Sequence, residues 1–287
     1  MKLIRFGDPG KEKPGLMLED GTRLDASSVV NNYDEDFFKD DAGLTKLGSW
    51  LKNNQGKATT IDSKVRIGCP VKKPGKLICV GLNYRKHAEE SGMALPTEPV
   101  IFFKATSSIV GPYDDIVIPR KSVKTDWEVE LAVVIGRKAS YINKEQAYDH
   151  IAGYVLHNDV SEREFQLERG GQWVKGKSCD TFAPLGPFIA TKDEIPNPND
   201  VSLWLEVNGK RLQNGTTKDF IFDVPHVVSY LSQFMSLHPG DIISTGTPSG
   251  VGFGLKPPQF LKPGDVVELG GQGLGTARQR VRGHGEG

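Results

Sequence analysis

The chain has 287 residues, with 37% hydrophobic and 25% charged side chains, which is enough to build one large domain or a main domain with a small accessory one. Lys and Arg together number 36, as do Asp and Glu, and this zero net charge argues against nucleic acid or an anionic membrane as the main partner. No apolar stretch approaches the roughly 18–20 residues of a membrane span, and the first residues turn polar too early for a secretory signal. Three cysteines without paired spacing are typical of reduced thiols. These features predict a soluble cytoplasmic protein.

The first 72 residues predict a small α+β domain. Leu3–Phe6 and Gly15–Glu19 have the composition of strands, and Asp20-Gly21 is a two-residue hairpin signal. A helix is indicated by the spacing of Leu44, Leu47, Trp50 and Leu51. The polar residues 57–76 then lead into an apolar run. We therefore place a domain boundary near residue 72.

Residues 73–287 predict a larger catalytic domain that is rich in strands. The expected strands include Leu77–Val80, Val100–Phe103, Trp127–Ile135, Gly153–His157 and Leu203–Val207. Asn208-Gly209 predicts a type I′ hairpin turn, Asp223 is a candidate helix cap, and Pro-Gly pairs precede two further strands. Few helices, no regular βαβ alternation and no dinucleotide-binding glycine motif indicate an α+β protein with a curled, mainly β core.

Two glutamates, Glu128 and Glu130, stand at the start of an apolar strand. Residues two apart in a strand share a face and lie about 6.6–6.8 Å apart along the chain. Such a pair often belongs to a solvated face, but two carboxylates that enter a core repel each other unless a cation is present. Asp159, at the end of another predicted strand, offers a third carboxylate. Three carboxylates at strand ends suit a hard divalent ion, Mg²⁺ or Mn²⁺.

His87 and Glu90 form a second candidate group, in a short helix predicted to run from a cap at Asn83 to a stop at Gly92. Three residues apart on a helix, their side chains share a face. A carboxylate orients an imidazole and raises its basicity, as a general base acting on water requires. A surface pair would have the same spacing. His157 is a rival ligand or base, although we favour a packed or solvent-facing strand residue.

Further polar residues follow these two groups. Arg163, Gln166 and Lys177 suit the binding of a carboxylate or ketone oxygen beside a metal, although helix-surface positions explain Arg163 and Gln166 equally well. Residues Ser244–Gly252 form a glycine-rich turn of small hydroxyl residues that includes Thr247. Such a turn either presents N–H groups and a hydroxyl to an anion or simply connects two strands.

Taken in this order, the segments resemble the fumarylacetoacetate hydrolase family, in particular its bacterial members that act on acylpyruvates and 2,4-diketo-3-deoxy sugar acids. The resemblance runs from about Gly75 to Leu269, and residues 1–72 match only loosely. Its five motifs are Val80-Gly-Leu-Asn-Tyr84 with His87 and Glu90, Trp127-Glu-Val-Glu130, Asn158-Asp-Val-Ser-Glu-Arg163, Lys175-Gly-Lys-Ser-Cys-Asp-Thr-Phe-Ala-Pro184 and Pro239-Gly-Asp-Ile-Ile-Ser-Thr-Gly-Thr-Pro-Ser-Gly-Val-Gly252.

This resemblance implies a mixed β-sandwich roll, a homodimer and Mg²⁺ as the usual ion. The implied roles are metal binding for Glu128, Glu130 and Asp159, water activation on a mobile lid for His87 with Glu90, a position beside the metal for Lys177, and substrate contact for Arg163, Gln166 and Thr247. Some relatives that cleave fumarylacetoacetate itself supply an additional aspartate ligand before the histidine. Val80–Tyr84 contains none, which favours the branch with three ligands.

The implied activity is hydrolytic cleavage of a C–C bond in a small 2,4-dioxo acid, which yields pyruvate and a second acid. The same enolate-stabilising site suits two other reactions, decarboxylation of oxaloacetate-like acids and isomerisation of a 2-hydroxy-dienoate. A catalytically silent scaffold that keeps the site is a third alternative.

Overall fold

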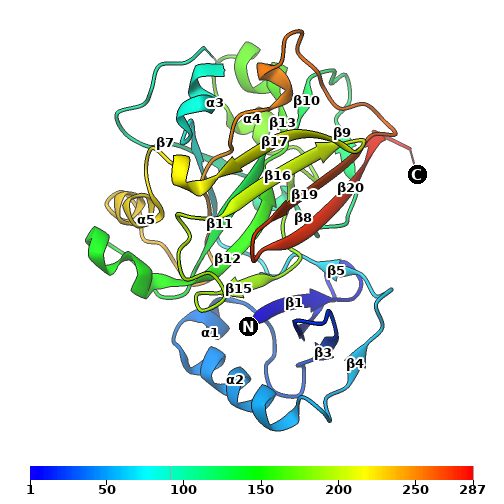
Figure 1. The fold of residues 1–287 in the computed structure, drawn as a ribbon, viewed down its shortest axis with the longest axis vertical. Helices are drawn as coiled ribbons and strands as arrows, with labels where there is room; N and C mark the ends of the chain where they lie inside the picture. Colours follow the sequence, from blue (N-terminus) through cyan, green and yellow to red (C-terminus); the bar gives the residue numbers. More distant parts are fainter. Residues whose placement is uncertain (91, 287) are drawn as a thin grey trace.

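The computed structural model describes residues 1–90 and 92–286 (Figure 1). The elements before residue 72 are β1 (Lys2–Phe6), β2 (Lys13–Met17), β3 (Arg23–Asp25), α1 (Glu35–Phe38), α2 (Ala42–Asn54), β4 (Thr60–Ile61) and β5 (Ile67–Gly68). The predicted hairpin joins β2 to β3 through a turn in which Gly21 has a φ of +85°, a conformation that favours glycine. The predicted helix is α2, in which Leu47 is fully buried.

The remaining elements alternate many strands with a few short helices. They are β6 (Leu77–Gly81), α3 (Arg85–Glu90), β7 (Val100–Lys104), β8 (Ile109–Val110), β9 (Ile116–Ile118), β10 (Thr125–Asp126), β11 (Val129–Ile135), β12 (Ile151–Asn158), β13 (Ser161–Glu162), α4 (Val174–Lys177), β14 (Ala183–Pro184), β15 (Ile189–Thr191), β16 (Ser202–Val207), β17 (Lys210–Thr216), α5 (Val224–Ser232), β18 (Ile242–Ser244), β19 (Val266–Gly271) and β20 (Gly275–Gly283). Within residues 1–90 and 92–286, no helix has the length and apolar character needed to cross a membrane.

The largest sheet has 11 strands and includes strands from both sides of residue 72. Its order is β4-β3-β2-β1-β15-β12-β11-β18-β6-β7, with β5 paired to β1. The antiparallel pairing of β1 with β15 sets Leu3 opposite Ile189, and Figure 1 shows the two strands side by side. The division of the chain near residue 72 stays a prediction, since one sheet runs through both parts.

A second sheet packs on the first and completes the core. It has five strands in the order β17-β16-β19-β20-β9. Leu203 and Leu205 of β16 lie in the same buried cluster as Val129 and Leu131 of β11. Two packed sheets joined by few helices confirm the predicted α+β, mainly β sandwich roll.

Strand β11 is buried on both of its faces, which explains why its sequence is a continuous apolar run. Val129, Leu131 and Val133 enter the cluster shared with the second sheet, whereas Ala132 and Val134 enter the cluster that includes the N-terminal elements. Glu130 therefore projects on the same face as Ala132 and Val134.

Local sequence signals agree with the structure at several turns and fail at one helix. Asn208 and Gly209 have φ values of 52° and 78°, as a type I′ turn requires, and the Asp223 side chain accepts from the N–H of His226 at the start of α5. The prediction that Asn83 caps a helix is wrong, because α3 begins only at Arg85. The Asn83 amide instead donates to the carbonyls of Phe222 and Thr245.

Candidate active site

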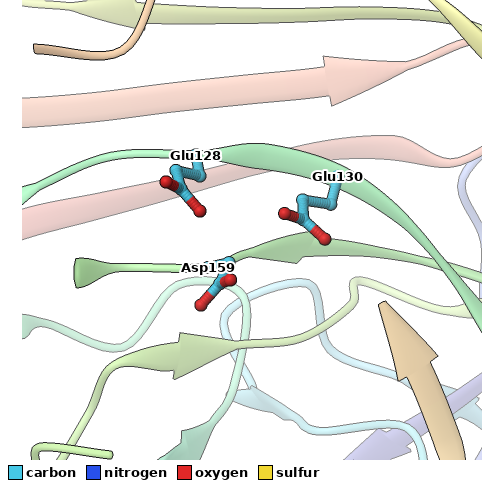
Figure 2. A group of neighbouring side chains, drawn as sticks. All are labelled: Glu128, Glu130 and Asp159. Atoms are coloured by element: carbon cyan, nitrogen blue, oxygen red, sulfur yellow. The ribbon is translucent and has the colours of Figure 1, made fainter. Parts of the chain in front are cut away.

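Glu128, Glu130 and Asp159 converge at the junction of β11 and β12. Each offers a carboxylate oxygen that lies within 4.8 Å of the others, and all three side chains are buried. Figure 2 shows the two glutamates projecting from one segment toward Asp159 on the neighbouring one. The register explains this, since the Asp159 N–H donates to the Glu128 carbonyl at 2.8 Å beside the antiparallel ladder. The predicted convergence of the three carboxylates is therefore present.

Two buried lysines neutralise much of this acidic charge. The Lys177 Nζ lies 2.6 Å from Glu128 Oε2 and 2.8 Å from Asp159 Oδ2. The Lys104 Nζ lies 2.6 Å from Asp159 Oδ1 and also donates to the Val160 carbonyl. Burial alone would raise the pKa of Asp159, but Lys104 and Lys177 outweigh burial and lower it.

Arg163 connects Glu128 of the acidic cluster to two further side chains, Asp126 and Gln166. Its guanidinium donates to Asp126, to Glu128 and, at 3.1 Å, to Gln166 Oε1. Burial disfavours the charged guanidinium, but these carboxylates prevail and raise its pKa. Asp126 also accepts from the backbone N–H groups of Gly252 and Phe253, at 2.7 and 3.0 Å. Asp126 therefore links the arginine to a segment about 125 residues further along the chain.

Glu130 is held by a different set of partners. Its Oε2 accepts from the Ser244 hydroxyl and from the Gly246 N–H at 2.9 Å, and among the described residues no hydrogen bond reaches its Oε1. Gly246 has a φ of +98°, and a Cβ there would lie 2.8 Å from the Asn83 Cβ, so this close approach requires glycine. Burial, followed by the charges of Asp159 and Glu128, raises the pKa of Glu130 well above 4.5.

His157 lies behind Glu130 and is packed, as the favoured interpretation held. Its Nδ1 is 2.6 Å from the Ser244 Oγ, and because the single hydroxyl proton goes to Glu130, the imidazole Nδ1 is the donor. Burial lowers the pKa of His157 to about 3, so the ring is neutral at physiological pH. Its Nε2 is buried without a hydrogen-bond partner among the described residues.

The cluster suits a divalent cation. It contains four buried carboxylates, Asp126, Glu128, Glu130 and Asp159, against three buried cations, Lys104, Arg163 and Lys177, so one negative charge is in excess once Glu130 is ionised. Oxygen donors of this kind are those that Mg²⁺ and Mn²⁺ prefer. The Glu130 Oε1, to which no donor of the described chain is hydrogen-bonded, is an oxygen that could bind such an ion.

His87 and Glu90 form the predicted pair on α3. The His87 Nδ1 lies 3.0 Å from Glu90 Oε1, and Glu90 also accepts from the Gly250 N–H. This arrangement fixes the tautomer, since Nδ1–H donates to the carboxylate and leaves Nε2 as the basic nitrogen. His87 lines the same cavity as the acidic cluster.

Thr247 lies in the cavity wall, but its hydroxyl has two partners of its own. It donates to the Val129 carbonyl at 2.9 Å and accepts from Gln213 Nε2 at 2.7 Å. The N–H groups of this glycine-rich turn likewise bind carboxylates of the protein, Gly246 to Glu130 and Gly250 to Glu90. The predicted anion-binding turn therefore positions the site's own acids, and substrate contact by Thr247 stays a prediction.

One cavity of about 120 Å³ unites the candidate residues. Eight of the nine predicted site residues line it, namely His87, Glu128, Glu130, Asp159, Arg163, Gln166, Lys177 and Thr247, and the ninth, Glu90, bonds to His87. Its lining also includes large hydrophobic residues, namely Leu82, Met93, Phe102, Leu167, Trp173 and Phe253. The positions agree with the predictions, whereas the roles of the residues stay predictions.

Sequence reasoning missed Lys104, Asp126 and Ser244. Lys104 ends the apolar run Val-Ile-Phe-Phe, and a lysine that closes a buried strand is the only local signal that it offers. Asp126 comes directly before the Trp-Glu-x-Glu motif, and its sequence position alone does not distinguish it from an exposed acidic residue at the end of a strand. Ser244 was seen only as part of a turn, since its contacts with Glu130 and His157 span 114 and 87 residues.

Comparison with known proteins identifies the class to which this fold and site belong. The family model described as fumarylacetoacetate (FAA) hydrolase C-terminal matches residues 76–282. The chain belongs to the fumarylacetoacetate hydrolase family, as the sequence motifs indicated.

Relatives extend the likeness to nearly the whole chain. A protein of Burkholderia multivorans, whose name gives a hydrolase and no substrate, is 51% identical over 98% of this chain and 99% of its own. The fumarylacetoacetate hydrolase of Exiguobacterium antarcticum is 36% identical with a TM-score of 0.85, and covers 99% of this chain and 100% of its own. A 5-carboxymethyl-2-hydroxymuconate delta-isomerase of Mycobacterium smegmatis is 33% identical with a TM-score of 0.78, over 100% of both chains. A maleylpyruvate hydrolase of Sphingobium sp. SYK-6 is 27% identical with a TM-score of 0.82, over 99% of this chain and 100% of its own. These names support an enzyme within a family of hydrolases and isomerases.

Proposed function

We propose that the protein is a divalent-metal-dependent hydrolase that cleaves a C–C bond in a 2,4-dioxo acid, either an acylpyruvate or a 2,4-diketo-3-deoxy sugar acid, to give pyruvate and a second acid. The observation that carries the proposal is the meeting of three buried carboxylates and a carboxylate-oriented histidine in one cavity. The first is a site for a cation, and the second is a base for water.

Glu128, Glu130 and Asp159 would hold the ion, Mg²⁺ or Mn²⁺. When bound, such an ion supplies positive charge that polarises a carbonyl oxygen and stabilises negative charge on it. The charge excess of the cluster and the free Glu130 Oε1 both favour this occupant.

His87 would activate the attacking water. Its Nε2 takes a proton from the water while Nδ1–H donates to Glu90. The negative charge of Glu90 then stabilises the imidazolium that forms. The hydroxyl oxygen then bonds to C4 of the substrate, and the C3–C4 bond breaks. The electron pair of that bond passes to the pyruvate enolate, and a proton returned to C3 gives pyruvate and the acid derived from C4 onward.

Lys177 and Arg163 would bind and orient the pyruvate part of the substrate. The Lys177 ammonium is buried and its pKa is raised, because Asp159 and Glu128 outweigh the effect of burial, so it is positively charged. A fixed positive charge in a water-poor cavity stabilises an enolate more than the neutral ketone that precedes it. Gln166, hydrogen-bonded to Arg163, would add a polar contact beside it.

A second candidate is isomerisation of a 2-oxo or 2-hydroxy-dienoate, which needs the enolate-stabilising centre but no attacking water. Its support is the isomerase name of a relative that matches the whole chain. An oxaloacetate-type decarboxylase would use the same centre. These reactions differ from hydrolysis in their products, which makes them separable.

The test is a panel of 2,4-dioxo acids with Mg²⁺ or Mn²⁺, in which loss of diketone absorbance is followed together with pyruvate formation. Equimolar pyruvate and second acid would support the hydrolase. A migrated double bond or release of CO₂ would instead support one of the alternatives. If no acid is turned over and no divalent ion binds, the protein is a catalytically silent scaffold and the proposal is wrong.

We also propose a homodimer in the cytoplasm, as the family resemblance implies. Sedimentation equilibrium would measure the oligomeric state, and the mass of a single chain, 31.4 kDa, would contradict the dimer.

A further inference from the structure

We infer that the group beyond C4 of the substrate is an uncharged hydrocarbon, so the enzyme prefers 2,4-dioxo monocarboxylic acids to dioates that carry a second carboxylate at the far end. This inference rests on the proposed function, since it names the substrate class of the same site. Its basis is the make-up of the cavity lining, in which every Lys or Arg of the described residues is already paired with carboxylates and the other large side chains are apolar.

No Lys or Arg of the described cavity lining is without a carboxylate partner, so none is free to bind a second anion. The only Lys and Arg side chains among the described residues that line the cavity are Arg163 and Lys177. Arg163 faces Asp126 and Glu128, and Lys177 faces Glu128 and Asp159, so each lies between two carboxylates. Lys104 is paired with Asp159 and does not line the cavity. The described lining therefore holds no further cation for a second anion beyond the two that would contact the pyruvate part.

Charge counting reaches the same conclusion. With a divalent ion bound and all four buried carboxylates ionised, the ion and the three buried cations leave one positive charge in excess. One positive charge balances the single carboxylate of the pyruvate part. A second carboxylate would be buried without a partner, and burying an unpaired carboxylate is strongly unfavourable.

Aromatic rings also pack against the two cations of the cavity lining. The Phe102 ring centroid lies 5.1 Å from the Lys177 Nζ, and the Phe253 centroid lies 5.9 Å from the Arg163 guanidinium carbon. Trp173 packs edge-to-face on Phe102 with centroids 5.3 Å apart. Together with Met93 and Leu167, these rings make up the hydrophobic wall of the cavity. Burying a hydrocarbon tail against this wall makes the binding free energy more favourable, because apolar surface leaves water. Burying a charged tail there makes it less favourable, because the charge loses its hydration.

The experiment uses two acids that differ at one position only, 2,4-dioxoheptanoate and 2,4-dioxoheptanedioate, in which a carboxylate replaces the terminal methyl group. Their dissociation constants are measured by calorimetry with the Mg²⁺-loaded His87→Ala variant, so that binding is read without turnover. We expect the monoacid to bind at least about 10-fold more tightly. Equal binding, tighter binding of the dioate, or binding of neither acid would overturn the inference. Because this readout needs no catalysis, failure of the hydrolase proposal would appear separately, as absence of pyruvate formation by the wild-type enzyme.

A charge placed on the apolar wall tests the cause of the preference. Leu167 is partly exposed, so Leu167→Arg introduces a guanidinium that no buried carboxylate already holds, and Leu167→Gln is the uncharged control of similar polarity. We expect Leu167→Arg to improve binding of the dioate about 10-fold relative to Leu167→Gln, with the gain shrinking at high salt. An equal effect of the two variants would show that missing positive charge does not set the specificity.

Discussion

The two halves of the site are held in place to very different degrees. The acids at the β11–β12 junction are fixed by sheet hydrogen bonds and by three buried cations, and the exposed fraction of the Asp159 side chain is 0%. His87, the proposed base, lies on the six-residue helix α3, and its one side-chain hydrogen bond within residues 1–90 and 92–286 is the one it donates to Glu90, which is 19% exposed. This contrast indicates that the half proposed to bind the ion is the more rigid, and that the half proposed to activate water has fewer contacts to hold it in place.

The strongest test of the rigid half is Asp159→Asn. The variant keeps the size of the side chain but removes the charge that faces Lys104 and Lys177. We expect turnover to be abolished and Mg²⁺ affinity, measured by calorimetry, to fall by at least about 10-fold. Full activity in Asp159→Asn would contradict the assignment of this carboxylate. The exposed Glu89→Gln on α3 is a control that should change neither quantity.

The strongest test of the half proposed to activate water is His87→Ala. Loss of the base should lower kcat by about 10²–10⁴-fold, because the water must then react without a proton acceptor. Mg²⁺ affinity should stay unchanged, since in the described part of the chain His87 is hydrogen-bonded to Glu90, which lies outside the cluster, and to no carboxylate within it. Steady-state kinetics and calorimetry measure the two quantities. A variant with near wild-type rate would refute the assigned base, and the exposed Lys86→Ala on the same helix is the matched control.

Lys104→Met should reveal how far the rigid half depends on its buried cations. Removing one partner of a buried pair typically costs about 3–5 kcal/mol in the free energy of unfolding. We expect a loss of this size in urea unfolding without metal, and a smaller loss with saturating Mg²⁺, which replaces the missing charge. A loss that Mg²⁺ leaves unchanged would mean that ion and lysine do not act on the same carboxylates. The exposed Lys64→Met serves as control.

The smallest expected effect is a pH dependence that comes from Glu130. Its pKa is raised in the folded chain, so the folded state retains a proton that the unfolded state loses as the pH rises above about 4.5. The folded state therefore binds more protons, and the free energy of unfolding without metal should fall with rising pH until the folded pKa is reached. Glu130→Gln should lack this part of the slope in urea titrations at several pH values. Parallel curves for the two proteins would contradict the shift.

The sequence predicted the parts of the site whose geometry is local. Glu128 and Glu130 share a strand face because they are two residues apart, and His87 reaches Glu90 because they are three apart on a helix. Asp159 was placed with the glutamates only because it ends a second strand, and the antiparallel pairing of β11 with β12 is what brings it there.

The rest of the site depends on contacts between distant segments that no local pattern encodes. Lys104 reaches Asp159 across 55 residues, and Asn83 binds carbonyls 139 and 162 residues away instead of capping its own helix. A helix cap is a weak preference of about 1 kcal/mol, which burial of a side-chain amide in a satisfied network readily outweighs. Fold class was easier to predict, because strand composition and turn residues repeat along the whole chain.

The continuity of the large sheet constrains how this enzyme can be divided. β1 is hydrogen-bonded to β15, and Leu3, Leu16, Leu24 and Tyr33 share a hydrophobic cluster with Ala132 and Val155 of β11 and β12. A fragment trimmed to residues 76–282 would leave one edge of β15 without a paired strand. It would also expose to water the hydrophobic side chains of β11 and β12 that the N-terminal residues bury. Unpaired edges promote association between chains. The first 72 residues thus act as a structural brace for the catalytic strands, although none of them lines the active-site cavity.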